Sequence, residues 1–338
     1  MYNEERKRAF LEAKGLSANS AGIMLSMFER IAEHERACGC DFSEMSEVQM
    51  SKAVSDVSGL SRKTIYAAES TLRDYVRWCA SEGYVENIKR EIKADVTDRV
   101  IRSMVCSPGD LLRTLDVVFP EPEINGIHYI YRAYLWLAFS GLEEKEAIRV
   151  EPRNLCFERM KILGVCGNFS EYEISREAVR DLQMASSMVQ ICENRGKRNV
   201  SLIWKERASG NQILRGKATE KTLEESLVSS IRPIVSRAFA RATKTAADGI
   251  RVNLSYRRAY MSGIFYREYM NELAGLRPNF SKYAHIDFYN RNQKDGYKLK
   301  GNYTEEHVIS ILRRSYEEDY LRWKNAFGLS VVEEYLPH

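Results

Sequence analysis

The sequence has few cysteines and no long apolar run near its start. Its seven cysteines show no paired C-x-x-C spacing, so we expect no metal site and no cofactor, and most should be small buried apolar residues. The opening MYNEERKRAFLEAKG is charged from its first turn, so neither a signal peptide nor a membrane anchor is expected and the cytoplasm is the expected location. The cysteines are Cys38, Cys40, Cys79, Cys106, Cys156, Cys166 and Cys192.

Internal repeats and low-complexity tracts are also absent. With 44% hydrophobic and 29% charged residues, the composition is that of an ordinary globular protein. A chain of 338 residues is long enough for two domains.

Positive charge is concentrated in one segment. Between Arg195 and Arg258 there are 15 Lys or Arg against 5 Asp or Glu, an excess of ten, although the whole chain carries only +4. The remainder therefore sums to −6. A solvated helical face usually mixes both signs, whereas this excess favours a surface that binds a polyanion, because lysines and arginines neutralise phosphates.

Helical patterns fill the first ninety residues and predict a compact bundle. One helix is capped by Ser17, a second follows Ser46, and a third begins after Ser61 and stops at Gly83. The residues expected on their buried faces are Ile23, Met24, Met27, Phe28 and Ile31 in the first, Val48, Met50, Val54 and Val57 in the second, and Ile65, Leu72, Val76 and Cys79 in the third.

The third helix opens with two cations. Arg62 and Lys63 lie in its first turn, where the helix dipole disfavours positive charge. A phosphate at this helix end would compensate that cost, and plain exposure to solvent is the alternative.

The remaining chain predicts a linker and a second domain. A charged, weakly patterned stretch indicates a linker over residues 89–106, between a helical domain at 1–88 and a domain at 107–338. In the second domain, Ser-Pro at 107–108 begins a helix, an apolar helix over 126–142 is central, and Gly167-Asn168 joins two short strands as a hairpin. Further helices are expected at 176–196, 222–249, 254–275 and 304–328. The fold class is therefore mainly α with a small β-sheet (α+β).

The segment SGLEEKE at residues 140–146 carries a resemblance that spans nearly the whole chain. It is similar to the motif T-G-L-R-x-S-E of the tyrosine recombinase (phage integrase) family, in which a helical core-binding (SAM-like) domain precedes a mixed catalytic domain. Gly141, Leu142 and Glu146 match the motif, but Glu143 stands where the family has an arginine. In the family that arginine holds the scissile phosphate and stabilises developing negative charge, which a carboxylate would repel.

Two further family positions are altered. The motif H-x-x-R falls at residues 254–257, where Arg257 is retained and Leu254 replaces the histidine. Leucine can neither donate to a phosphate oxygen nor move a proton. The turn at 166–169 lacks the lysine that the family has in this hairpin. Lys161 starts the first strand and comes too early to take its place.

The family's nucleophilic tyrosine cannot be assigned to one residue. Tyr289, Tyr297 and Tyr303 all follow Arg257 at imperfect distances, and His285 only loosely resembles the histidine that usually precedes the tyrosine. A chain with nineteen tyrosines places some of them nearby in any case, so a structural or DNA-contacting role is the first interpretation of each.

These losses, taken with the resemblance, imply a catalytically inactive recombinase-like protein. The expected function is a sequence-specific transcriptional regulator that binds double-stranded DNA in the bacterial nucleoid, similar to the recombinase-derived lysogeny repressors of SPβ-type prophages. An ordinary salt bridge is the alternative for Arg257. The residues expected to contact phosphates are Arg62, Lys63, Arg237, Arg241, Lys244, Arg257 and Arg258.

Two other functions stay open. A divergent active integrase would need an arginine such as Arg149 or Arg153 in place of Glu143. A partner-binding module would form a homo-oligomer by exchanging its C-terminal helix, as recombinases do. The tail VVEEYLPH, with Val331, Val332 and Leu336, would then dock on a neighbouring copy, or otherwise on its own domain.

Overall fold

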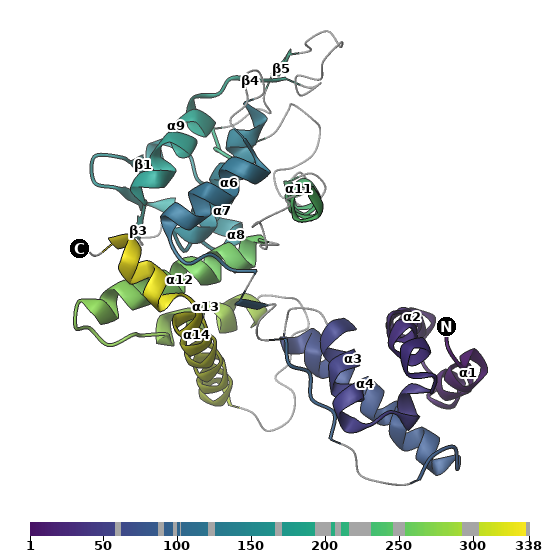
Figure 1. The fold of residues 1–338 in the computed structure, drawn as a ribbon. Helices are drawn as coiled ribbons and strands as arrows, with labels where there is room; N and C mark the ends of the chain where they lie inside the picture. The colour runs from purple at the N-terminus through teal and green to yellow at the C-terminus, as the bar shows by residue number, and fades with distance from the viewer. Residues whose placement is uncertain are drawn as a thin grey trace. The chain divides into compact units, whose positions relative to one another are not determined.

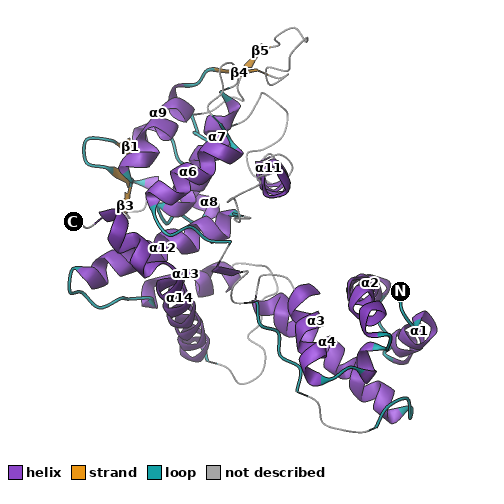
Figure 2. Ribbon diagram, viewed as in Figure 1, coloured by secondary structure: helices purple, strands orange, loops and turns teal. Residues whose placement is uncertain are grey.

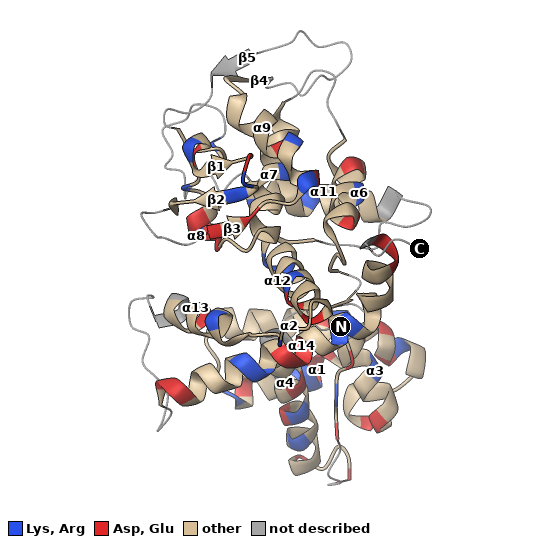
Figure 3. Cartoon of the chain, turned by 90° about the vertical axis from the view of Figure 1, so that its left-hand side faces the viewer, with Lys and Arg blue, Asp and Glu red and all other residues tan. Residues whose placement is uncertain are grey.

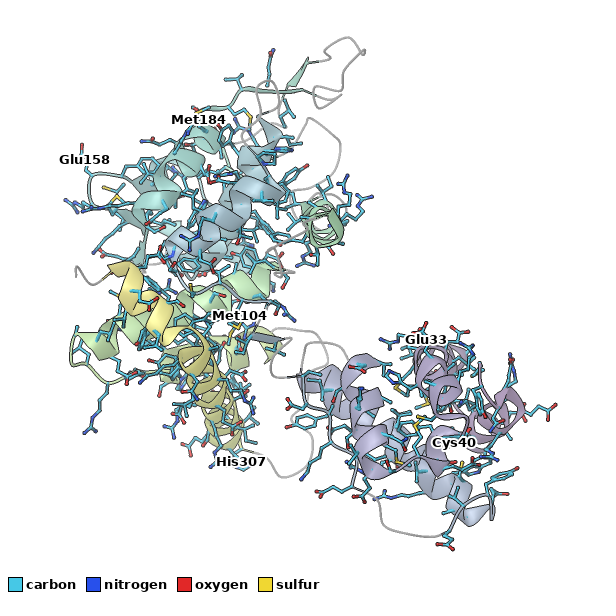
Figure 4. All side chains as sticks on the ribbon, viewed as in Figure 1. Glu33, Cys40, Met104, Glu158, Met184 and His307 are labelled. Atoms are coloured by element: carbon cyan, nitrogen blue, oxygen red, sulfur yellow. The ribbon has the colours of Figure 1, made fainter. Side chains whose placement is uncertain are left out.

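The computed structural model of the chain describes residues 1–57, 62–86, 91–96, 100–101, 103–120, 126–165, 171–192, 204–206, 211–215, 231–245, 254–292 and 304–335. The chain divides into two compact units, Met1–Val100 and Ile101–His338 (Figure 1). Their boundary falls within residues 89–106. Ile92 packs into the core of the first unit, and Met104, labelled in Figure 4, belongs to the core of the second.

The described residues of the first unit form a bundle of four α-helices. They are α1 (Glu4–Ala13), α2 (Ala18–Cys38), α3 (Glu47–Val57) and α4 (Arg62–Ser81). The predicted cap is confirmed, because the Ser17 side chain accepts a hydrogen bond from the Ser20 amide at 3.4 Å. Phe10, Phe28 and Tyr75 form the aromatic centre of the core, with ring centroids 5.1–6.2 Å apart.

Two residues expected on buried faces of this bundle are exposed. Val48 is 79% exposed and Ile23 is 65% exposed, so both predictions were wrong. With about 3.6 residues per turn, Val48 lies on the side of α3 opposite Met50, Val54 and Val57, which are buried. Ile23 stands outside the stripe on α2 that buries Met27 and its neighbours.

The second unit is built around one buried helix. Figure 2 shows α7 (Ile127–Phe139) as a helix of this unit, and every residue from Tyr129 to Phe139 is buried, as the sequence predicts. The helix packs against α9 (Val179–Ser187) and α12 (Tyr256–Leu273). The other helices are α6 (Pro108–Val118), α8 (Glu144–Ala147), α11 (Arg232–Thr245), α13 (Ser281–Asn292) and α14 (Glu305–Tyr335).

Short antiparallel strands complete this unit. Strands β1 (Leu155–Cys156), β2 (Lys161–Leu163) and β3 (Glu171–Glu173) form one sheet in that order. Ile162 pairs with Tyr172, so the two strands of the predicted hairpin are paired, whereas Gly167-Asn168 lies outside the described residues. A second sheet pairs β4 (Gln190–Cys192) with β5 (Trp204–Glu206). The predicted fold class, mainly α with a small sheet, is confirmed.

Two helix boundaries differ from the prediction. The helix expected over 176–196 ends at Ser187 and gives way to β4, in which Ile191 pairs with Lys205 of a later segment. The last helix continues seven residues past Gly328 to Tyr335. Gly328 lies inside α14, beside Tyr269, whose hydroxyl donates to the Gly328 carbonyl at 3.3 Å and would be 3.1 Å from an added Cβ.

The C-terminal helix packs on its own unit. Val331 is fully buried, the Trp323 indole donates to the Val105 carbonyl at 3.2 Å, and the Ser107 hydroxyl donates to Glu334 at 2.6 Å. This arrangement fits the second alternative for the tail as far as Tyr335, and Leu336 lies outside the described residues. No helix within the described ranges is both long and apolar enough to span a membrane.

Helices α7 and α12 approach most closely at a glycine. A Cβ added at Gly263 would lie 1.9 Å from the Phe139 carbonyl oxygen. We expect Gly263→Ala to lower the free energy of unfolding by about 1–3 kcal/mol, because the two helices must separate. Gly22→Ala is the matched control: an added Cβ there meets nothing within 4 Å, and this change should raise stability by about 0.5–1 kcal/mol. Chemical denaturation measures both, and equal effects would contradict the close approach.

Candidate nucleic-acid interface

The turn between α7 and α8 is built by the residues that match the family motif. Gly141 has a φ of +95°, which glycine adopts without strain, and Leu142 is fully buried. The Tyr256 hydroxyl donates to the Leu142 carbonyl at 2.9 Å. Glu146 caps the short helix, since its carboxylate accepts from the Glu143 amide at 3.0 Å. The matching residues therefore fix the backbone of this turn.

Glu143 lies beside the retained arginine. Its Oε1 atom is 3.9 Å from an Nη atom of Arg257, too far for a hydrogen bond. This oxygen is buried and has no hydrogen-bond partner among the described residues. Burial raises the pKa of Glu143 above its ordinary value, and the charge of Arg257 opposes that shift only in part.

Arg257 is held by a second carboxylate. Its Nη2 atom donates to Asp287 on α13 at 2.7 Å and to the Tyr316 hydroxyl on α14 at 2.8 Å. The guanidinium lies over the ring of Tyr260, 5.0 Å from its centroid. The side chain is still 49% exposed. The salt bridge considered for Arg257 is therefore present, and it ties together α8, α12, α13 and α14.

Sequence reasoning missed both Asp287 and Tyr316. Asp287 lies two residues after His285, in a segment inspected for a histidine, and Tyr316 is one of nineteen tyrosines. Glu144 was noticed but its partners were not. It forms a two-point ion pair with Arg232 on α11, 2.8 Å at the Nε atom, and accepts a hydrogen bond from Tyr134. Residues far apart in sequence form these pairs, so no spacing rule indicates them.

The other family positions do not join this cluster. Leu254 is buried, with 1% of its surface exposed. His285 is exposed, and its Nδ1 lies 2.8 Å from the Ser281 carbonyl of its own helix. Lys161 begins β2 and forms an ion pair with Glu171 on β3. None of these side chains contacts Arg257.

The candidate nucleophiles and replacement arginines are placed as follows. Tyr289 is on α13 and 67% exposed, whereas Tyr297 and Tyr303 lie outside the described residues. Arg149 is exposed. Arg153 is 80% exposed and paired with Glu151 at 2.7 Å. The hydrogen bonds of Arg257 go to Asp287 and Tyr316, and neither arginine is among those partners.

Exposed cations follow one face of α11. Arg237 and Arg241 are both exposed and one turn apart, and the Arg241 Nε donates to the Arg237 carbonyl at 3.4 Å. Figure 3 shows basic residues on α11 and acidic residues on α8 and β3. Arg62 and Lys63 are the first residues of α4 and Lys244 lies near the end of α11, but the side chains of all three are outside the described part.

Arg258 differs from the other predicted contacts. Its side chain is half-buried, and one Nη atom is buried without a hydrogen-bond partner within the described ranges. Burial lowers the pKa of Arg258 to about 10, so the guanidinium stays positive at neutral pH. A buried guanidinium nitrogen without a partner favours an anion as its ligand.

Comparison with known proteins assigns the first unit. Residues 1–81 match the family model described as "MrpR, N-terminal core-binding domain", which confirms the core-binding domain predicted for this part of the chain. No curated protein matches at a significant level.

Two similar solved structures are both of the Tn1549 transposon integrase in complex with circular intermediate DNA, one with an arginine-to-lysine substitution. Each shares 11% sequence identity with this chain over 92% of it. The alignments cover 94% and 93% of the integrase chains, with TM-scores of 0.33 and 0.34.

Proposed function

We propose that this chain is a sequence-specific double-stranded DNA-binding regulator on a tyrosine-recombinase-like fold that has lost strand-transfer activity, such as a prophage lysogeny repressor. The observation that supports it most is the state of Arg257. Asp287 binds the arginine directly at 2.7 Å, and Glu143 lies beside it at 3.9 Å. Two carboxylates therefore surround the cation that, in the resembling family, holds the scissile phosphate.

The chemistry of phosphoryl transfer explains why this arrangement opposes catalysis. A transition state that gathers negative charge needs fixed donors, and losing one such donor costs about a hundredfold or more in rate. Here one donor is replaced by a carboxylate and another is occupied by a carboxylate. A phosphate arriving at Arg257 would meet negative charge in a partly buried site, where repulsion is stronger than in water.

DNA binding rests on other cations. The first unit, whose residues 1–81 match a core-binding domain model, is one proposed contact surface for DNA. In the second unit Arg237 and Arg241 are exposed, and Arg258 has an unpaired buried Nη atom among the described residues. Such groups neutralise phosphates, release counterions and make the affinity depend on salt. Arg62, Lys63 and Lys244 remain predicted contacts.

Charge reversal on α11 should weaken binding. We expect Arg237→Glu with Arg241→Glu to reduce DNA affinity by about tenfold or more and to flatten its dependence on salt, because two phosphate contacts become repulsive. Titration of labelled DNA at several salt concentrations measures both quantities. Arg322→Glu is the control, since Arg322 on α14 is 47% exposed and paired with Asp319 at 3.2 Å. An equal loss in the control would mean that only total charge matters.

Removing the charge of Glu143 should strengthen binding. If this site faces a phosphate, Glu143→Gln raises DNA affinity by about two- to fivefold, the size of one partly exposed charge interaction. Because burial raises the pKa of Glu143, the wild type should approach the affinity of the variant as the pH falls through that raised pKa. Affinities of both proteins across an acidic pH series test this. Parallel curves would mean that Glu143 does not face DNA.

The test of the whole proposal is a search for covalent chemistry. DNA sites recovered from the source genome are incubated with purified protein, and a phosphotyrosyl adduct is sought. Binding at promoters without an adduct supports the regulator. The competing hypothesis, an active recombinase, draws on the exposure of Tyr289 and predicts an adduct that disappears in Tyr289→Phe.

A further inference from the structure

A second candidate site lies away from Arg257. A pocket of about 530 Å³ opens between the base of the β2–β3 hairpin, the C-terminal end of α7, residues 266–267 of α12, and the start of α6. This volume is in the usual range for small-ligand and peptide side-chain pockets. None of the residues that line it belongs to the Glu143, Arg257 and Asp287 cluster.

The pocket combines apolar and cationic walls. Phe139 and Ile174 are buried members of the core, and Met160 and Tyr266 pack against them. Around this apolar surface stand four cations against two carboxylates, an excess of two positive charges. The cations are Arg159, Lys161, Arg176 and Arg267, and the carboxylates are Glu173 and Glu177.

The cations are not equally available. Lys161 is paired with Glu171, and Arg267 donates to the Phe139 carbonyl at 2.6 Å, so both have partners. Arg159 and Arg176 are exposed and form no ion pair within the described part of the chain. Together with Arg267, whose carbonyl partner is neutral, they are positive charges at this pocket that a ligand can still neutralise.

Strand β3 offers main-chain groups at the same place. The Ile174 amide donates to the Met160 carbonyl at 2.8 Å, so alternate residues of β3 face β2 with their backbone groups. The backbone groups of Glu173 then face the opposite way, toward the open edge of the described sheet. An extended peptide can pair with such an edge.

We propose that this pocket binds a short acidic peptide segment of another protein, with one apolar side chain inserted among Phe139, Met160 and Tyr266. The carboxylates of the segment pair with Arg159 and Arg176. A peptide uses all three features of the pocket at once, namely the apolar wall, the unpaired arginines and the strand edge. A small inorganic anion would use only the arginines.

The test uses full-length protein without DNA, so its outcome is independent of the proposed function. The probes are fluorescein-labelled, terminally blocked heptapeptides with Asp or Glu on both sides of one central apolar residue. A second, neutral set has Asn or Gln in place of each Asp or Glu. Fluorescence anisotropy measures the dissociation constants. We expect acidic peptides with a large apolar centre to bind at least about tenfold more tightly than their neutral counterparts.

Variants with opposite charge changes make the result specific. Arg159→Glu with Arg176→Glu should weaken acidic-peptide binding by about tenfold or more, whereas Glu173→Gln should strengthen it by about two- to fivefold. Arg153→Glu is the control, because this exposed arginine is outside the pocket lining and paired with Glu151.

Three outcomes would overturn the proposal. They are equal binding of acidic and neutral peptides, an equal loss in Arg153→Glu, and no peptide binding together with weaker DNA binding in the Arg159 and Arg176 variant. The last outcome would assign the pocket to DNA.

Discussion

Replacing Lys7 with methionine is expected to lower the free energy of unfolding of the first unit by about 3–5 kcal/mol. Its ammonium group lies 2.5 Å from each carboxylate oxygen of Glu35 and also donates to the Tyr2 carbonyl at 2.6 Å. Lys7 and Glu35 are both fully buried. The substitution leaves Glu35 without its counterion in a place where burial already raises the pKa of that carboxyl.

The double variant distinguishes the loss of the Lys7–Glu35 attraction from the cost of an unpaired, buried Glu35 carboxylate. Lys7→Met with Glu35→Gln removes both charges but keeps an oxygen that accepts from the Phe42 amide, a bond of 2.9 Å in the native protein. It should recover most of the stability, because a buried ion pair can be replaced by neutral groups at little cost. Arg8→Met is the exposed control and should cost less than about 1 kcal/mol, since Arg8 is 58% exposed and paired with Glu4.

Hydrogen exchange of the full-length chain provides the measurement. Amides of α1 and α2 should exchange faster by a factor that matches the loss of stability, while those of the second unit keep their rates. A loss below about 1 kcal/mol in Lys7→Met would contradict the expected cost of a buried, unpaired carboxylate.

A comparable loss is expected in the second unit for Asp181→Ala, about 3–5 kcal/mol. Asp181 is buried and accepts from the Arg132 Nε at 2.8 Å and from the Trp136 indole at 2.7 Å. Arg132 is itself only 1% exposed. Truncating the aspartate leaves a buried cation with one partner fewer and an indole N–H with none.

The same arginine supplies the control. Arg132 also pairs with Asp116 at 2.9 Å, and that carboxylate is 53% exposed. Asp116→Ala should cost about 1 kcal/mol or less, because water can take its place. The two variants are compared by urea unfolding, monitored through the hydrogen exchange of the α7 amides. Similar losses of stability in the two variants would mean that burial of the aspartate does not determine how strongly it binds Arg132.

Local sequence rules predicted the elements whose causes are local. Ser17 and Ser107 cap helices as expected, and the apolar run of α7 forms the centre of its unit. A local rule placed a helix end at Gly328, whereas α14 continues through this glycine to Tyr335 and the glycine lies against Tyr269. The strand β4 was not predicted, because it forms by pairing with β5, which lies beyond residue 200.

The candidate site follows the same division. The motif positions Gly141, Leu142 and Arg257 could be found along the chain, whereas the carboxylate of Asp287 reaches Arg257 only through the packing of α13 on α12 and α14. A long-range ion pair has no periodicity, so no sequence pattern could indicate that the retained arginine is already paired.

The packing of α14 has a consequence for synthesis on the ribosome. The bonds from Trp323 to Val105 and from Ser107 to Glu334 join residues 218 and 227 positions apart, the first and last parts of the second unit. We therefore expect the first unit to fold while translation continues at about 5–20 residues per second. The apolar side chains of α12 that contact Trp323, namely Phe265 and Tyr269, lack this contact until the final helix has left the exit tunnel, and during that interval the nascent chain is most dependent on chaperones.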